Sequence, residues 1–157
     1  MKLLFKQRLF SWLDSYDIYD EVGNVVYRVE GKISFGHKLF IYNHNHEHIA
    51  TIKEEVLTFL SRFSMYINEQ YIGCIQKELS LFKPKFQIDC NNWRVEGDFW
   101  QWDYQIVNQQ NQVIGTINKD IFHVTDTYNL TITNSQDTLY VLMIVLAIDA
   151  QKCSRNK

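Results

Sequence analysis

Residues 138–148 form an uncharged apolar run, and this run restricts the fold of the chain more than any other feature. Its eleven residues, TLYVLMIVLAI, are too few for a membrane-spanning helix, which needs about 20. Residues of the type that cap helices, NSQD, come before the run, and Ala150 and Gln151 favour a continuing helix, although the β-branched content would also allow a strand. A helix that is apolar on every side must be surrounded on every side. We therefore expect a helix over approximately residues 136–152 inside a barrel.

An internal repeat in the rest of the chain predicts the wall of this barrel. Apolar positions recur at spacings of eight and eleven residues in three copies, and a fourth copy is one residue shorter: Ile18–Val26–Val29, Ile41–Ile49–Ile52, Ile106–Ile114–Ile117 and Met65–Ile72–Ile75. A polar turn with Asn, Gln, Glu or Gly lies between the two halves of each copy, as is typical of hairpin turns. Each copy is therefore interpreted as a β-hairpin.

The whole chain contains about twelve candidate strands when the alternation between apolar and polar residues is followed. A closed antiparallel barrel would leave no strand edge exposed. The 157 residues match one domain, since domains usually have about 100–200, so we expect a single domain over residues 1–157. The strands are expected to begin near Leu9, Tyr16, Val25, Leu39, Ile49, Phe63, Tyr71, Phe86, Trp93, Asp103, Val113 and Val124.

Four segments resemble the LURP-one-related (LOR) family, in its bacterial YxjI-like branch. They are residues 6–12 (KQRLFSW), 18–32 (IYDEVGNVVYRVEGK), 95–100 (VEGDFW) and 142–149 (LMIVLAID), and the resemblance covers residues 3–150. It implies a tubby C-terminal-like fold, a closed barrel of antiparallel strands around a central hydrophobic C-terminal helix. The related tubby and scramblase groups associate with membranes, but no Lys/Arg constellation of this chain matches theirs residue by residue.

Charge and cysteine content narrow the classes of partner and compartment. Sixteen Lys and Arg face eighteen Asp and Glu, a net charge of −2, so we expect no nucleic-acid partner. The three cysteines show no CxxC spacing, which is typical of reduced thiols in a cytoplasmic protein. The N-terminus has no apolar signal-peptide region because Lys6 and Arg8 interrupt it, and the sequence has no transmembrane segment.

Three histidines at alternate positions, His44, His46 and His48, form the most conspicuous candidate metal site. Imidazole is a common metal ligand, and alternate residues of an extended strand share one side. The repeat instead aligns His46 with Gly23, which predicts a solvent-exposed hairpin turn. The sequence leaves open whether these histidines bind a metal, and we assign no metal ligand.

Other groups of reactive residues do not form a recognisable catalytic arrangement. Sequence does not place the carboxylate pairs in one cleft, and no feature links Cys90 to His123 as nucleophile and base. We therefore assign no catalytic or cofactor-binding residue and expect no cofactor. The carboxylate pairs considered are Glu54 with Glu55, Glu96 with Asp98, and Asp120 with Asp126.

Trp100 and Trp102 would share a face if their segment were a strand. Packing across the barrel wall is the preferred interpretation, and an exposed patch that contacts a ligand or a second copy is the alternative. The function predicted from the sequence is a non-enzymatic binding or scaffold domain of unknown ligand, with a phospholipid or a protein as candidate partner. The alternatives are a peripheral phospholipid-binding protein and a metal-dependent enzyme with a site at the barrel rim.

Overall fold

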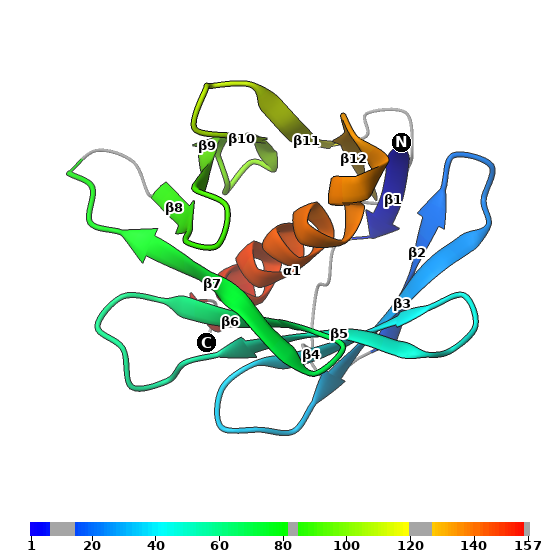
Figure 1. Ribbon diagram of the computed structural model, residues 1–157, viewed down its shortest axis with the longest axis horizontal. Helices are drawn as coiled ribbons and strands as arrows, with labels where there is room; N and C mark the ends of the chain where they lie inside the picture. The colour runs from blue at the N-terminus through cyan, green and yellow to red at the C-terminus, as the bar shows by residue number, and fades with distance from the viewer. Residues whose placement is uncertain (7–14, 82–84, 120–126, 156–157) are drawn as a thin grey trace.

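The structure is a computed structural model that describes residues 1–6, 15–81, 85–119 and 127–155 (Figure 1). Its described residues contain twelve strands, a 3₁₀ turn η1 (Ser135–Asp137) and a helix α1 (Thr138–Arg155). The strands are β1 (Lys2–Lys6), β2 (Ser15–Asp20), β3 (Val25–Lys32), β4 (Lys38–Asn43), β5 (His48–Glu54), β6 (Arg62–Ile67), β7 (Gln70–Glu78), β8 (Lys85–Ile88), β9 (Trp93–Asp98), β10 (Asp103–Val107), β11 (Val113–Lys119) and β12 (Thr127–Ile132).

The strands form a closed antiparallel barrel in which each strand pairs with its neighbours in sequence, and β1 closes the ring by pairing with both β2 and β12. The predicted fold class is therefore confirmed. The first and last strands differ from expectation: β1 begins at Lys2 and β12 at Thr127, whereas Leu9 and Val124 lie outside the described residues. The positions of these two strands follow from the long-range pairing of β1 with β12. A local pattern of apolar residues gives no information about such a pairing.

Helix α1 passes through the barrel, and Figure 1 shows the strands around it. From Val141 to Ile148 no residue exposes more than 1% of its surface. The strands contribute the inner positions of the repeat, including Ile18, Ile41 and Ile106, each 0% exposed. Gly115 on β11 lies where an added Cβ would be 2.9 Å from Cγ1 of Val141, so the absence of a side chain there allows the helix to approach the wall.

The helix begins two residues later than predicted, at Thr138, because residues 135–137 form the 3₁₀ turn. The side chain of Asn134 caps this turn by accepting a hydrogen bond of 3.1 Å from the backbone N–H of Gln136. Among the residues that the structure describes, no helix is long and apolar enough to cross a membrane.

Three hairpins of the repeat use the same five-residue turn. In the first, Oδ1 of Asp20 accepts backbone hydrogen bonds from residues 22 and 24, at 3.0 and 2.8 Å. Asn43 and Asn108 make the same pair of bonds in their own turns. The fourth residue of each turn has a positive φ: 90° at Gly23, 62° at His46 and 63° at Asn111. The turns are therefore closed mainly by their own Asp and Asn side chains, and only one of them uses glycine.

Candidate functional site

The barrel has two chemically different ends. The turn end, where α1 begins, carries the hairpin turns at residues 20–25, 43–48, 67–70, 88–93 and 107–113. The loop end, where α1 finishes, carries the connections that include residues 33–37, 55–61, 79–81 and 99–102. In Figure 1 the turns between β2 and β3 and between β4 and β5 lie on the right, and the connection between β5 and β6 lies on the left.

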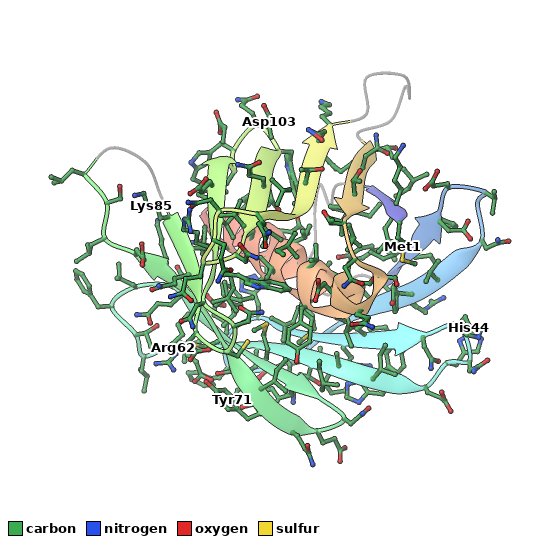
Figure 2. All side chains as sticks on the ribbon, turned by 45° about the horizontal axis from the view of Figure 1, so that its top comes forward. Met1, His44, Arg62, Tyr71, Lys85 and Asp103 are labelled. Atoms are coloured by element: carbon green, nitrogen blue, oxygen red, sulfur yellow. The ribbon has the colours of Figure 1, made fainter. Side chains whose placement is uncertain are left out.

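The three candidate histidines lie at the turn end. His46 occupies the positive-φ position of the turn, as its alignment with Gly23 predicts, and His44 lies at the tip that Figure 2 labels. His48 packs on the barrel wall instead: its ring stacks on Phe40 at 4.2 Å, and its Nε2 lies 2.9 Å from Oγ1 of Thr51. Within residues 1–6, 15–81, 85–119 and 127–155 no three His, Cys, Asp or Glu side chains form a metal-binding group.

The candidate carboxylates at residues 54 and 55 are separated and engaged with different partners. The Glu54 carboxylate accepts a hydrogen bond of 2.9 Å from the backbone N–H of His37 and lies 2.5 Å from Nδ1 of the same residue. The hydrogen bond from the His37 side chain lowers the pKa of Glu54 against the opposing effect of burial. Glu55 accepts a hydrogen bond of 2.7 Å from Ser64. Each group therefore has a structural role at the rim, and the pair lacks the shared cleft that acid–base catalysis requires.

The described cysteines are poorly suited to nucleophilic chemistry. Burial raises the pKa of the Cys74 thiol, which also donates a hydrogen bond of 3.3 Å to Asp89. Burial and the neighbouring Asp89 carboxylate raise the pKa of Cys90. A catalytic thiol needs a lowered pKa, so neither environment activates its sulfur. His123, Asp120 and Asp126, named as candidates from the sequence, lie outside the described residues.

A shallow groove of about 340 Å³ crosses the outer wall over β9, β10 and β11. Gly97, with a φ of 125°, is one of its lining residues, and a Cβ there would lie 2.6 Å from the backbone oxygen of Asp103, so the absence of a side chain allows β9 and β10 to approach closely. The groove offers two carboxylates, amides and a hydroxyl, which suit hydrogen bonding but supply no nucleophile–base pair. Its lining residues are Glu96, Gly97, Asp103, Tyr104, Gln105, Thr116 and Asn118.

Trp100 and Trp102 do not share a face, because the condition for it, a strand over this segment, is not met. Residues 99–102 form a turn rather than a strand, and Trp102 adopts a φ of 56°. Trp102 is only 2% exposed and its ring centroid lies 4.3 Å from that of Tyr128, whereas Trp100 is 46% exposed. A turn does not alternate its side chains as a strand does, so one ring enters the core and the other remains outside.

The interior near the end of α1 is closed. A cavity of about 10 Å³ lies between the helix and Phe86, which is no more than the space of about 10–15 Å³ that a single water needs. Lys152 covers this position: its Nζ donates a hydrogen bond of 2.7 Å to the backbone oxygen of Phe99 and lies 4.0 Å from the centre of the Trp102 ring. A ligand at the loop end therefore has to bind on the surface.

The loop end carries a concentration of exposed apolar side chains, which we call the apolar crown. Eight of the thirteen large exposed hydrophobic residues in the described part of the chain lie on its four connections. They are Ile33 (90% exposed), Phe35 (85%), Val56 (44%), Leu57 (97%), Phe59 (94%), Leu79 (78%), Leu81 (95%) and Trp100 (46%). A folded protein that leaves so many large apolar side chains exposed at one end usually has a binding partner there.

Hydrogen bonds and close packing hold the crown loops on the barrel. The loop at residues 33–37 packs against the β5–β6 loop, since a Cβ on Gly36 would lie 2.5 Å from Cγ1 of Val56. Ser61 at the end of the β5–β6 loop accepts a hydrogen bond of 2.9 Å from the side chain of Gln151 on α1. The backbone oxygen of Ser61 also accepts a hydrogen bond of 2.9 Å from Lys77. The two loops are therefore anchored to each other, to the barrel and to the helix.

A row of lysines lies beside the two crown loops at residues 33–37 and 55–61. Lys32 on β3 is directly opposite Lys38 on β4, and Lys38 is directly opposite Lys53 on β5. Lys32 forms an ion pair of 2.6 Å with Glu30. Lys38 and Lys53 make no ion pair with any other described residue, and Nζ of Lys38 lies 5.2 Å from the centre of the Phe40 ring.

The sequence reasoning missed both the crown and the lysine row. The sequence does contain a signal for the crown in residues 56–60, VLTFL. These residues lie between two predicted strands and do not occupy any of the inner positions of the repeat. Lys32 and Lys38 also flank the short apolar segment that holds Ile33 and Phe35. The alignment of Lys53 with them depends on strand register, which the sequence does not state.

Comparisons with known proteins agree with this architecture. The family profile described as "LOR: LURP-one-related" matches residues 1–149. The chain is 28% identical over 150 residues to the uncharacterized protein YxjI of Bacillus subtilis (strain 168), which covers 95% of this chain and 92% of the relative. An X-ray structure of an Arabidopsis thaliana protein superposes with a TM-score of 0.66 at 11% identity, over 96% of this chain and 90% of the other. Profile, relative and fold agree over nearly the whole length, and the chain belongs to the LURP-one-related family.

Proposed function

We propose that this LOR protein is a non-enzymatic binding domain, a single unit over residues 1–157 in the cytoplasm, that engages its partner with the apolar crown. The observation that carries this proposal is the near-complete exposure of Leu57 and Phe59, at 97% and 94%, on a loop whose two ends are anchored. Side chains of this size are usually buried, so their fixed exposure at one end favours a docking surface.

The geometry of the described polar groups gives less support to an enzyme. The rim carboxylates of Glu54 and Glu55 have separate structural partners. The outer-wall groove combines acidic and amide side chains without a histidine, lysine or cysteine. A metal-dependent activity at the rim would need ligands that converge, and the described histidines and carboxylates there do not. The relationship to tubby C-terminal domains stays a prediction.

Photo-crosslinking at single sites in the cells that make the protein tests the proposed function. Benzoylphenylalanine replaces Leu57 in the crown or, as a control, Asn45 at the exposed tip of the β4–β5 turn. We expect adducts of higher mass, or lipid adducts identified by mass spectrometry, from position 57 and not from position 45. Equal adduct formation at both positions, or none at position 57, would contradict a crown-based binding function.

A further inference from the structure

We propose that the partner of the crown is an anionic membrane surface, with the apolar loops inserted among the lipids and the lysine row facing their phosphates. This inference rests on the proposed function, because it names the occupant of the same surface. It concerns mainly the side of the crown formed by the loops at residues 33–37 and 55–61, where apolar side chains and lysines lie together.

The form of the apolar side chains favours lipid over a folded partner. Ile33, Phe35, Leu57 and Phe59 each expose at least 85% of their surface, so they stand apart on their loops and share little contact area with neighbours. Protein hot spots usually fit preformed pockets and are surrounded by a packed rim. A fluid acyl-chain boundary surrounds separate apolar side chains without any matching shape, and Leu and Phe are typical of the inserted side of interfacial proteins.

The lysine row supplies the charge complementarity. Like charges directly opposite each other on antiparallel strands are unfavourable, and here three lysines are aligned across β3, β4 and β5. Glu30 already supplies the counter-charge of Lys32, and an anionic lipid surface would supply that of Lys38 and Lys53, because it attracts lysines near its plane. Lys32 comes immediately before the crown residue Ile33, and Lys53 is three residues before Val56, so both charges lie at the base of the inserted loops.

The loops are also ordered before they bind. His37 lies between Lys38 and Gly36, and its contacts with Glu54 fasten the β3–β4 loop to the end of β5. The neighbouring loop closes by a hydrogen bond of 2.9 Å from the backbone N–H of Glu55 to the oxygen of Arg62. Binding through preordered loops loses little conformational entropy, which increases the affinity available from a few inserted side chains.

The opposite end of the barrel provides matched controls. At the turn end Val22 is 82% exposed but lies in the polar Asp20–Asn24 turn, and Lys2 lies outside the row, on β1. Figure 2 shows His44 of the turn end and Lys85 of the loop end on opposite sides of the molecule. A change at Val22 or Lys2 therefore alters the same chemistry on a surface that would face away from the membrane.

The test is co-sedimentation of the purified full chain with phosphatidylcholine vesicles, with and without phosphatidylglycerol, at low and at high salt. We expect binding to the phosphatidylglycerol vesicles at low salt, and weaker binding at high salt because ions screen the lysines. The L57S/F59S variant should lose at least about tenfold in partition coefficient, and K38Q/K53Q about tenfold, whereas V22S and K2Q should match the wild type. Thermal melts verify that every variant is folded.

Failure of the wild type to bind phosphatidylglycerol vesicles at low salt would overturn the membrane assignment, as would equal losses in V22S and L57S/F59S. If position 57 still crosslinks to a protein in cells, the binding function stands and its occupant is that protein instead. A dimer in light scattering that L57S/F59S abolishes would assign the crown to a second copy of the chain. Absence of both vesicle binding and crosslinking would refute the proposed function as well.

Discussion

The same substitution at two leucines tests both the buried helix and the exposed crown. Leu142 on α1 is 0% exposed, whereas Leu57 in the β5–β6 loop is 97% exposed. Leu142→Ala removes buried carbon atoms and leaves a cavity between the helix and the wall, a change that lowers the free energy of unfolding by about 3–5 kcal/mol. Leu57→Ala removes atoms that already contact solvent, so its effect should stay within about 0.5 kcal/mol.

Thermal and urea unfolding of the two variants, followed by circular dichroism, give the measurement. In a domain of this size 1 kcal/mol shifts the melting temperature by about 2–4 °C, so Leu142→Ala should melt about 6–20 °C below the wild type. Leu57→Ala should melt within about 2 °C of the wild type, and the urea m-values should be unchanged. A Leu142→Ala variant that melts with the wild type, or a Leu57→Ala variant that loses as much stability, would refute the assigned positions of these side chains.

Three further changes test local features of the fold. His46→Gly should raise the free energy of unfolding by about 0.5–1 kcal/mol, because the φ of 62° suits glycine, whereas His44→Gly should give no gain in the same urea titration. Gly115→Ala should lower stability by about 1–3 kcal/mol, because its Cβ would lie 2.9 Å from Val141, and Val141→Ala in the same chain should restore part of the melting temperature. The pKa of Glu54 is lowered in the folded state, so the contribution of its carboxylate to the free energy of unfolding is complete above the ordinary pKa of 4.5 and is lost as the pH falls through the lower folded value. Glu54→Gln should therefore flatten the acid side of a stability–pH curve measured by urea unfolding. An unchanged acid side would contradict the role of the His37 contact.

The fold could be predicted because its determinants are periodic and local. Ile18, Ile41 and Ile106 occupy equivalent positions of the repeat, and all three are 0% exposed on the inner face of the barrel. The turns between the strands are closed by side chains within the same five residues, so their positions also follow from the sequence. The apolar run was a reliable indication of burial because no face of that helix could contact water without exposing large side chains.

The candidate surface could not be predicted in the same way, since it depends on long-range geometry. Leu57 and Phe59 have the composition of core residues, and only the path of their loop beyond the rim exposes them. Trp102 shows the opposite case. Its sequence context resembles a strand, but it lies in a turn with a positive φ, and its side chain is buried in the core. The lysine row depends on the register that aligns Lys53 with Lys38, and one residue of slip would direct the side chain to the other face.

The filled barrel also limits where recognition can take place. Some β-barrels hold a small molecule in their interior. Here α1 occupies that space, and the cavity near its end measures about 10 Å³. At the turn end the side chains of Asp20, Asn43 and Asn108 accept hydrogen bonds from backbone N–H groups of their own turns. The loop end is different, because its connections expose large apolar side chains, and the nearby Lys38 and Lys53 make no ion pair with another described residue. The proposed binding at the loop end is therefore consistent with a barrel whose interior is filled by its own helix.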